Sequence, residues 1–424
     1  SPLCNRRYKI CDRYCERQDR AIDRTIHMKK IMILGASILQ LPAILQAKKM
    51  GLEAVVVDMN PEAVGFRENG IEKEIISTND IDCVLEAAIR HQINGIMTLA
   101  SDLPMRTVAA VAEKMGLVGI SGDTALKATN KAAMRQALKE AGVPIPVFYC
   151  VNTIDEFHKI IRSFTGKFIV KPADNSGSRG VCLLEHNDDL TAADQAFLYS
   201  KRFCHTGEMI VEEFMEGPEV SVETISVDGV CHVIQITDKL TTGAPYFVEM
   251  GHSQPCCLSE KTKREIAKAA VEANKAVGIK NGPSHTEIKI TPNGAKIVEI
   301  GARLGGDNIT THLVPLSTGV NMVECCIRIA IGENPDLSIK YDKGAAIRYF
   351  DSPKGVIHNI IGIPDAEKID GIQQISIVHG VGYTAHEIHN SVDRVGFVIA
   401  QSDNAESAVR ACKKAVDMVK FQVG

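Results

Sequence analysis

The stretch HTEIKITPNGAKIVEIGARLGG, residues 285–306, contains two glutamates, Glu287 and Glu299, and then Arg303. Polar and apolar residues alternate over 285–290 and again over 295–300, with the turn sequence PNG between, so the stretch predicts a β-hairpin. Because side chains two apart share a face of a strand, the hairpin can place Glu287 beside Glu299. Adjacent carboxylates repel unless a cation separates them, and Mg²⁺ is usually held by one or two carboxylates together with substrate phosphates. With Arg303 close behind, the pair is typical of a metal–phosphate site, although a surface hairpin with solvated acids has the same pattern.

Composition limits the classes of protein to consider. The chain has 424 residues, 45% of them hydrophobic and 24% charged, which indicates a globular protein with more than one domain. A net charge of −4 argues against a nucleic-acid-binding protein. No apolar run is long enough for a membrane span, and the Arg-rich first residues lack the apolar core of a signal peptide. The 13 cysteines follow no framework spacing, so we expect reduced thiols and a cytoplasmic location, with no nucleic-acid or membrane partner.

The first part of the chain divides into an extension and an alternating α/β region. Residues 1–27 are rich in Arg and Lys, and we interpret them as a disordered or weakly helical extension. From residue 30 strands and helices alternate, which predicts a parallel, doubly wound domain over 28–122. The dinucleotide fingerprint is absent, because GASILQ after the first strand has one glycine where three are needed. Asp58 at the end of the second strand is therefore interpreted as a cap, and Asp102 after a later strand either contacts a substrate or caps the next helix.

Two lysines occupy positions that suit anion binding. Lys131 begins a predicted helix, where a cation is electrostatically unfavourable, and this favours a role as an anion ligand; a solvated lysine is the alternative. Lys171 ends an apolar strand. The small, polar loop after it contains Ser176, Gly177 and Ser178, and its backbone amides could cradle a phosphate. An ordinary hairpin loop is the alternative for this glycine-rich flap.

Two further segments carry acidic and imidazole side chains. Residues 209–227 predict two strands around a Gly-Pro turn, where the backbone of the first strand could pair with a flat base and Glu219 could accept hydrogen bonds from vicinal hydroxyls. The stretch TDKLTTGAPYFVEMGHSQPCCLSE is expected to be a long loop, in which Glu249 and His252 could line a substrate pocket. The remainder is expected to form an apolar helix over 317–331, short strands over 344–402 and a final helix over 403–420.

In this order and spacing the motifs resemble those of the ATP-grasp enzymes, and the resemblance covers nearly all of residues 28–424. It implies an α/β, half-Rossmann-like N-terminal domain, a two-lobed α+β ATP-grasp fold and a small β-rich C-terminal domain. The corresponding boundaries are 28–122 for the first domain, 123–205 for the lobe with the flap, 206–335 for the lobe with the metal site and 336–424 for the last. The resemblance implies ATP binding by Lys131, Lys171, Ser176, Gly177, Ser178, Glu212, Glu213, Phe214, Met215 and Glu219, with Mg²⁺ or Mn²⁺ on Glu287 and Glu299.

Within that superfamily, EIGARLGGD together with EMGH looks most like the carboxylate–amine ligases that join two amino acids. The resemblance implies ATP-dependent amide formation through an acyl phosphate, with release of ADP and phosphate. It also implies an amino-acid pocket lined by the catalytic candidates Arg303, Glu249 and His252. Many ATP-grasp enzymes carry Asn two residues after the second metal glutamate, whereas this chain has Gly301, so another group must complete the metal shell.

Three alternatives stay open at this point. Ligases of the purine pathway, carbamoyl-phosphate synthetases and biotin carboxylases share the scaffold. A second alternative is a nucleotide-binding protein that keeps this fold but has lost catalytic activity. The charged residues of the predicted site are all present, which argues against it. Related enzymes often form dimers through the first domain, so a homodimer is a further alternative for the oligomeric state.

Overall fold

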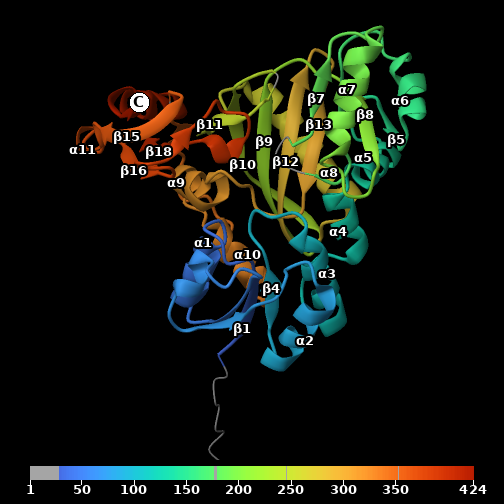
Figure 1. Ribbon diagram of the computed structural model, residues 1–424. Helices are drawn as coiled ribbons and strands as arrows, with labels where there is room; N and C mark the ends of the chain where they lie inside the picture. Colours follow the sequence, from blue (N-terminus) through green and yellow to red (C-terminus); the bar gives the residue numbers. More distant parts are fainter. Residues whose placement is uncertain (1–27, 176–178, 245, 352) are drawn as a thin grey trace, which may run out of the picture.

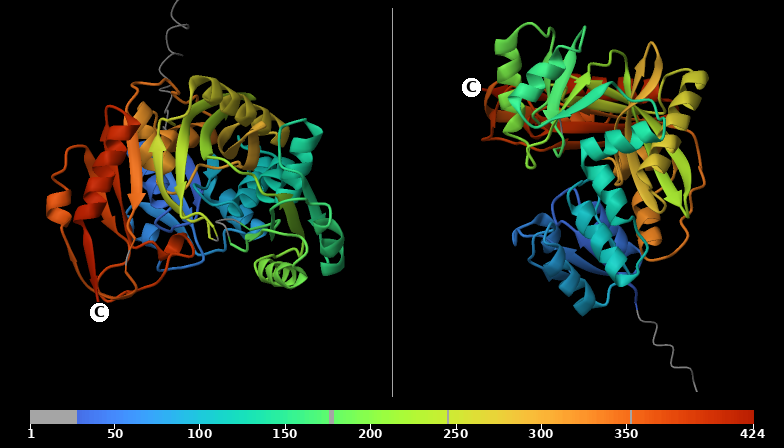
Figure 2. Two further views of the ribbon diagram at one scale, coloured as in Figure 1. Left: turned by 90° about the horizontal axis from the view of Figure 1, so that it is seen from above. Right: turned by 90° about the vertical axis from the view of Figure 1, so that its right-hand side faces the viewer.

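The computed structural model describes residues 28–424 except 176–178, 245 and 352. The predicted flap residues Ser176, Gly177 and Ser178 therefore lie outside the described part of the chain. The described strands form one sheet of eight strands, two of four and one of three. Figures 1 and 2 show the N-terminal sheet on one side of the molecule and the other sheets together above it.

The N-terminal domain is built on a four-stranded parallel sheet with strand order β3-β2-β1-β4. Its elements are β1 (Lys30–Leu34), α1 (Leu41–Lys49), β2 (Glu53–Val57), η1 (Val64–Arg67), β3 (Ile71–Glu74), α2 (Ile81–His91), β4 (Gly95–Met97), α3 (Pro104–Met115) and α4 (Gly122–Thr129). Strands β1 and β2 read KIMIL and EAVVV and are buried almost throughout, as expected for a parallel sheet covered on both faces. Asp58 accepts hydrogen bonds from the backbone amides of Ala36 and Asn60, which confirms the predicted cap at the end of β2.

The small lobe, which we define as residues 148–213, contains an antiparallel sheet with strand order β5-β8-β6-β7. Helix α5 (Lys131–Glu140) precedes it, and its elements are β5 (Phe148–Val151), α6 (Ile154–Ile161), β6 (Phe168–Pro172), β7 (Cys182–Leu184), α7 (Leu190–Lys201) and β8 (Met209–Glu213). Phe157, Phe168 and Phe197 are buried in its hydrophobic core. This packing fixes β6 and β8, the strands that carry Lys171 and Glu212.

The eight-stranded sheet has the order β13-β12-β9-β10-β11-β14-β18-β16, with every neighbouring pair antiparallel. Its elements and the covering helix α8 are β9 (Glu219–Val227), β10 (Val230–Thr241), β11 (Glu249–Gln254), α8 (Glu260–Val277), β12 (Gly282–Thr291), β13 (Gly294–Gly301), β14 (Gly344–Tyr349), β16 (Ile372–Ile377) and β18 (Gly396–Ser402). The expected long loop after residue 236 is wrong, because β10 extends to Thr241 and β11 contains Glu249 and His252. Strand β11 reads EMGHSQ, and a polar sequence of this kind carries no strand signal even though it lies inside the sheet.

The C-terminal part completes the large sheet and adds a small one. Its remaining elements are η2 (Ile309–Leu313), α9 (Val314–Thr318), α10 (Met322–Ala330), β15 (Gly355–Ile361), α11 (Ile363–Ala366), β17 (Thr384–Ala385), η3 (Ser391–Asp393), α12 (Ala405–Met418) and β19 (Lys420–Val423). The single helix expected over 317–331 is wrong, because Gly319, with a φ of +77°, separates α9 from α10. The expected final helix is confirmed as α12. Strands β14, β16 and β18 continue the sheet that also contains β12 and β13, so the domain boundary at residue 336 stays a prediction.

Within the described residues no single helix is long and apolar enough to cross a membrane. The segments Ile309–Thr318 and Met322–Ala330 reach the length and apolar content of a membrane span only when taken together, and the chain bends by 112° between them.

Candidate active site

One cavity of about 330 Å³ lies between the small lobe and the eight-stranded sheet. That volume suits a small-molecule or cofactor site. Strands β6 and β8 line it from one side, and β10, β11, β12 and β13 from the other. The cavity brings together these predicted site residues: Lys131, Lys171, Glu212, Glu213, Phe214, Met215, Glu219, Glu249, Glu287, Glu299 and Arg303. Of the predicted residues that the structure describes, His252 alone does not line it.

Strands β12 and β13 form the predicted hairpin, and their register pairs Glu287 with Glu299. Each carboxylate has a lysine partner: Lys239 Nζ lies 3.1 Å from Glu287 Oε1, and Lys131 Nζ lies 2.9 Å from Glu299 Oε1. Burial opposes ionisation of Glu287, but Lys239 and His285 outweigh it and hold the pKa of that carboxyl well below its ordinary value. Two adjacent oxygen-donor side chains that face a cavity fit a hard divalent cation such as Mg²⁺.

The segment after β8 supplies an apolar wall. The rings of Phe214 and Phe247 line the cavity with their centroids 6.2 Å apart. Just before this segment, the buried carboxylate of Glu212 accepts hydrogen bonds from Arg135 at 2.8 Å and from Lys171. Burial opposes ionisation of Glu212, but Arg135 and Lys171 outweigh it and lower its pKa to about 2. A buried ion triad therefore fixes a segment whose neighbouring side chains suit a flat base.

Glu219 lies at the start of β9, directly after a tight turn. Its carboxylate accepts hydrogen bonds from Lys239 at 2.6 Å and from Lys289 at 3.1 Å. A Cβ on Gly217, whose φ is +134°, would lie 1.9 Å from Ile290 O. Only glycine fits this close approach of the turn to β12, and the turn thereby sets the position of Glu219.

Arg303 follows β13 and connects the hairpin to the N-terminal domain. Its Nε donates to Asp102 Oδ1 at 2.6 Å. Of the two interpretations left open for Asp102, helix capping is wrong, because the described residues give α3 no side-chain cap. Burial opposes the charge on Arg303, but Asp102 outweighs it and raises the pKa of the guanidinium. A Cβ on Gly301 would lie 3.3 Å from Asp102 Oδ1, so the position where many relatives carry Asn lies beside this ion pair.

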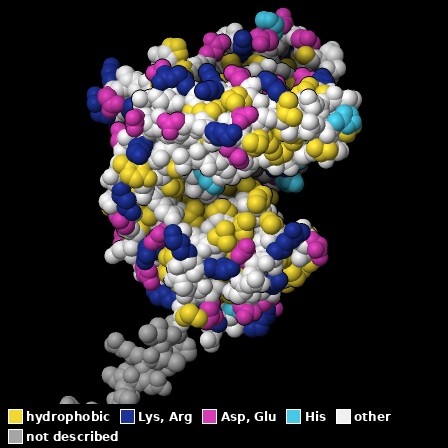
Figure 3. Space-filling view, turned by 90° about the vertical axis from the view of Figure 1, so that its left-hand side faces the viewer, with side chains coloured by type: hydrophobic (Ala, Val, Ile, Leu, Met, Phe, Trp, Pro, Cys, Tyr) yellow, Lys and Arg dark blue, Asp and Glu magenta, His cyan; other side chains and the backbone are white. Residues whose placement is uncertain are grey.

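The contact between Asp102 and Arg303 crosses from the N-terminal domain to the rest of the molecule. Figure 3 shows the surface hollowed between these two parts, with hydrophobic side chains gathered on the floor of the hollow. Two residues 201 positions apart in the chain thus meet at one site.

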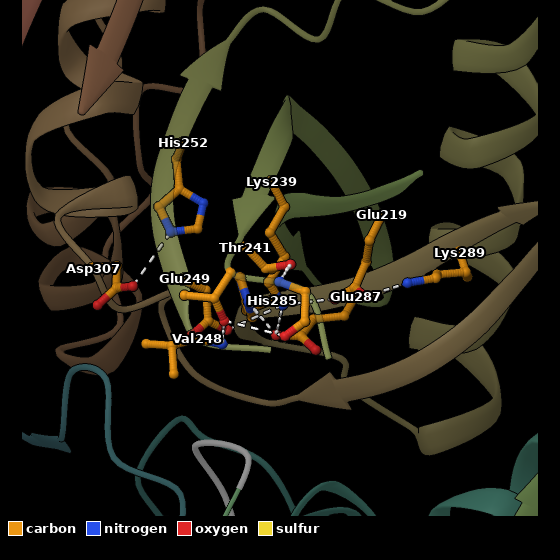
Figure 4. A network of polar contacts seen from close by, with 12 residues as sticks. Glu219, Lys239, Thr241, Val248, Glu249, His252, His285, Glu287, Lys289 and Asp307 are labelled. Atoms are coloured by element: carbon orange, nitrogen blue, oxygen red, sulfur yellow. Dashed lines mark hydrogen bonds and ion pairs between the residues drawn. The ribbon is translucent and has the colours of Figure 1, made fainter. Parts of the chain in front are cut away.

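His252 does not line this cavity but is buried in a separate ion cluster, and its predicted role in a substrate pocket stays a prediction. It is 3% exposed, and its Nε2 lies 3.3 Å from Asp307 Oδ2 (Figure 4). Asp307 also accepts two hydrogen bonds from Arg394, at 2.8 and 2.9 Å, and Arg394 donates to the backbone oxygen of Glu249 at 2.9 Å. The physical reason is the loop after Arg303, where the left-handed residue Asp307 (φ +51°) brings its carboxylate against the imidazole. His252 therefore supports the strand that carries Glu249.

Lys239 also lines the cavity, although its local sequence indicated no role for it. Its ammonium contacts Glu219, Glu249 and Glu287, which lie on three different strands (Figure 4). Burial opposes the charge on Lys239, but the three carboxylates outweigh it and hold the pKa of the ammonium well above its ordinary value. Lys239 could not be recognised while this segment was expected to be a loop, because its position on β10, separated from β12 by β9 alone, brings it to these acids.

Three further residues near the cavity were not predicted from the sequence as part of the site: His285, Glu223 and Arg135. His285 Nδ1 lies 2.7 Å from Glu223 Oε1, and its Nε2 lies 3.7 Å from Glu287 Oε1. Burial disfavours the imidazolium, but Glu223 outweighs it and raises the pKa of His285 to about 9. The two-residue spacing of His285 and Glu287 puts both on one face of β12, a signal that could have found the histidine. Arg135 lies one helical turn after Lys131, within the buried face of α5.

Comparisons with known proteins identify two regions of the chain. The family model of the ATP-grasp domain matches residues 164–311, and that of the L-amino acid ligase C-terminal domain 2 matches residues 348–424. The L-arginine-specific L-amino acid ligase of Bacillus subtilis is 27% identical over 282 residues, which are 65% of this chain and 67% of that protein. The phosphoribosylamine–glycine ligase of Methanocaldococcus jannaschii is 24% identical over 430 residues, covering 93% of this chain and 94% of that protein. The crystal structure of L-amino acid ligase from Bacillus licheniformis has a TM-score of 0.80 at 21% identity and covers 93% of this chain and 99% of its own.

The chain therefore contains an ATP-grasp domain, and its relatives are named as ligases, which together support an ATP-dependent ligase that forms C–N bonds. Within that class it resembles the L-amino acid ligases, because its C-terminal region matches their second C-terminal domain. The predicted fold class is confirmed, since a parallel α/β sheet precedes the ATP-grasp region and its antiparallel sheets. The roles of individual residues stay predictions.

Proposed function

We propose that this enzyme joins the carboxylate of one amino acid to the amine of another and releases ADP and phosphate. The observation that carries the proposal is the meeting of Glu287, Glu299, Arg303 and an apolar wall in one cavity. We also propose a cytoplasmic location, which the ten free cysteines among the described residues support.

The reaction must first make a carboxylate reactive, because the charge on its oxygens makes it a poor electrophile. One carboxylate oxygen attacks the γ-phosphorus of ATP, the bond from that phosphorus to the β-phosphate oxygen breaks, and an acyl phosphate and ADP result. The amine nitrogen then attacks the acyl carbon, the C–O bond breaks, inorganic phosphate leaves and the nitrogen loses a proton. The protein contributes positioning and compensation of negative charge.

The nucleotide would lie between the small lobe and the large sheet. Phe214 and Phe247 supply the apolar wall for the base, while the backbone from Glu212 to Met215 is the segment that can pair with its edge. The ribose hydroxyls would bind Glu219, whose carboxylate lies at the mouth of the tight turn before β9.

The phosphates would bind Lys131 and Lys171, whose ammonium groups already lie in the cavity wall. Glu287 and Glu299 would hold Mg²⁺ or Mn²⁺, which when bound neutralises phosphate charge and orients the γ-phosphoryl group. Gly301 offers no side chain, so the remaining metal ligands would be phosphate oxygens or water.

The amino-acid substrates would bind near Arg303 and Glu249. Asp102 holds the Arg303 guanidinium, which can compensate the charge that develops on the acyl phosphate. Glu249 offers a carboxylate for the amino group of a substrate. His252 acts on this subsite indirectly, because Asp307 and Arg394 connect it to the backbone of Glu249.

A ligation of the purine pathway is the second candidate, because the match to phosphoribosylamine–glycine ligase spans nearly the full length of both chains. The acid would then be glycine and the amine phosphoribosylamine. The C-terminal match over residues 348–424 favours the amino-acid ligation.

The two candidates are separated by incubating the protein with ATP, Mg²⁺ and pairs of substrates while phosphate release and product mass are followed. We expect ADP and phosphate only when both an acid and an amine are present, together with a product whose mass is the sum of two amino acids less one water. Turnover restricted to glycine and phosphoribosylamine would instead support the second candidate. Release of AMP and pyrophosphate would contradict both.

A further inference from the structure

The ammonium of Lys239 contacts three glutamates that line the cavity from three different strands. Its ammonium lies 2.6 Å from Glu219 Oε1, 3.1 Å from Glu287 Oε1 and 3.2 Å from Glu249 Oε1 (Figure 4). The ammonium donates hydrogen bonds to Glu219 and Glu287, and Glu249 is an ion-pair partner. The acids have separate proposed partners, which are the ribose, the metal and a substrate amino group.

Three carboxylates around one point would attract a divalent cation if no ammonium lay between them. Oxygen ligands lie about 2.0–2.1 Å from Mg²⁺ and about 2.3–2.6 Å from Ca²⁺, so the carboxylates at 3.1 and 3.2 Å from the ammonium would have to move closer to hold either cation. The Lys239 side chain is 7% exposed, so its charge is screened little by solvent. Because like charges repel, this ammonium opposes entry of a divalent cation at Glu287.

Glu299, the other predicted metal ligand, also has a lysine as its ion-pair partner. Lys131 Nζ lies 2.9 Å from Glu299 Oε1, and the Lys131 side chain is 11% exposed. Both carboxylates of the hairpin therefore have an ammonium partner. A divalent cation that binds without nucleotide has to displace a lysine ammonium from its carboxylate. The cavity then holds both positive charges, which repel each other.

We propose that Lys239, together with Lys131, bars divalent cations from the nucleotide-free site and makes metal binding depend on the nucleotide. This inference rests on the proposed function, because it takes Glu287 and Glu299 as the metal ligands. The phosphates of ATP bring negative charge with which the lysines can pair, and this frees the two carboxylates for the cation. Because Glu249 shares the same ammonium, the exchange also releases the acid proposed to bind the substrate amino group. Lys239 is thus a positioning residue that places substrate binding after binding of the metal–nucleotide complex.

The test measures Mn²⁺ binding by electron paramagnetic resonance of the free ion, with and without a non-hydrolysable ATP analogue. The amount of Mn²⁺ held by the analogue alone is determined separately. For the unaltered protein we expect binding to be at least about tenfold weaker without the analogue than with it. The Lys239→Met variant should bind Mn²⁺ without nucleotide at least about tenfold more tightly than the unaltered protein, because it exposes three converging carboxylates.

Two matched variants serve as controls. Lys239→Arg keeps the positive charge and should behave as the unaltered protein does. Lys48→Met removes the same charge from a lysine that lies 2.8 Å from Glu68 in the N-terminal domain, and it should leave Mn²⁺ binding unchanged.

Each outcome separates the inference from the proposed function. Equal Mn²⁺ affinity of the unaltered protein with and without nucleotide would overturn the inference while leaving the metal role intact. An unchanged nucleotide-free affinity in folded Lys239→Met would also overturn it. No Mn²⁺ binding even with nucleotide would instead contradict the metal role of Glu287 and Glu299. If Lys239→Met does not fold, the comparison of the unaltered protein with and without nucleotide still decides.

Discussion

The ion pair between Asp102 and Arg303 gives a prediction whose size can be worked from the structure. Asp102→Asn keeps the shape of the side chain and removes its charge, so Arg303 loses a charge-assisted hydrogen bond of 2.6 Å. Such a bond is worth roughly 1.5–3 kcal/mol, and every 1.4 kcal/mol of lost transition-state stabilisation is about tenfold in rate. Because the guanidinium remains present, we expect the loss in kcat/KM to be about tenfold to one hundredfold. Arg303→Met removes the cation itself and should cost about 10²–10³-fold, by analogy with loss of an oxyanion donor.

The same variant should also lose some stability. The two side chains are only 15% and 16% exposed, so the loss should exceed the roughly 1 kcal/mol of an exposed pair and stay below the roughly 3–5 kcal/mol of a fully buried one. The assay compares phosphate release and thermal unfolding of Asp102→Asn, Arg303→Met and the control Asp123→Asn, whose exposed carboxylate pairs with Lys127 at 2.6 Å. A loss in Asp102→Asn as large as that in Arg303→Met would refute the positioning role and show that Asp102 acts on the substrate itself. Full activity in Asp102→Asn would show that Arg303 needs no support from the N-terminal domain.

Three further predictions concern the metal site and the buried ion triad. Glu299→Gln should lose about 10²–10³-fold in the rate of phosphate release while its thermal unfolding stays close to that of the unaltered protein, and full activity would contradict the metal role. Arg135→Met leaves Glu212 with one cation in a fully buried site and should lower the free energy of unfolding by roughly 3–5 kcal/mol in urea. The surface variant Arg328→Met is the control for that measurement, and a loss as small as the control's would show that Lys171 alone compensates Glu212. The pKa of Glu212 is about 2, below its ordinary value of 4.5, so its contribution of roughly 3 kcal/mol is present above pH 4.5 and disappears as the pH falls towards 2. Urea midpoints measured from pH 5 to pH 2 should show this decline, and they should show less of it in Arg135→Met.

The hairpin could be predicted because its signal is local. Alternation over two short segments and a turn between them gave both strands, and the register then placed Glu287 opposite Glu299. Lys131 and Lys171 were found in the same way, from a helix start and a strand end. All four residues face the cavity, as the spacing indicated.

Contacts between distant segments could not be predicted from such patterns. Asp102 and Arg303 are 201 positions apart, and nothing in either local sequence specifies the other. The buried cluster of His252, Asp307 and Arg394 likewise joins β11 to a loop and to the C-terminal region. The local sequence contains no sign of that cluster, so it could not predict that His252 is buried against Asp307.

The fold shows the same division between local and distant information. Buried runs such as EAVVV identified the parallel strands directly. Strand β11 was missed because it is polar in sequence although its last four residues are buried, so hydrophobic periodicity does not mark it. The break between α9 and α10 depends on one glycine inside an apolar stretch, which periodicity alone does not reveal as the end of a helix.

The central claim is that the acid substrate is activated as an acyl phosphate. Its most direct test is to supply the substrate with both carboxylate oxygens labelled with ¹⁸O and to determine the mass of the released phosphate. Attack of the carboxylate on the γ-phosphorus predicts one ¹⁸O atom in inorganic phosphate and none in the nucleotide. Appearance of the label in AMP, or unlabelled phosphate alongside amide product, would contradict the account.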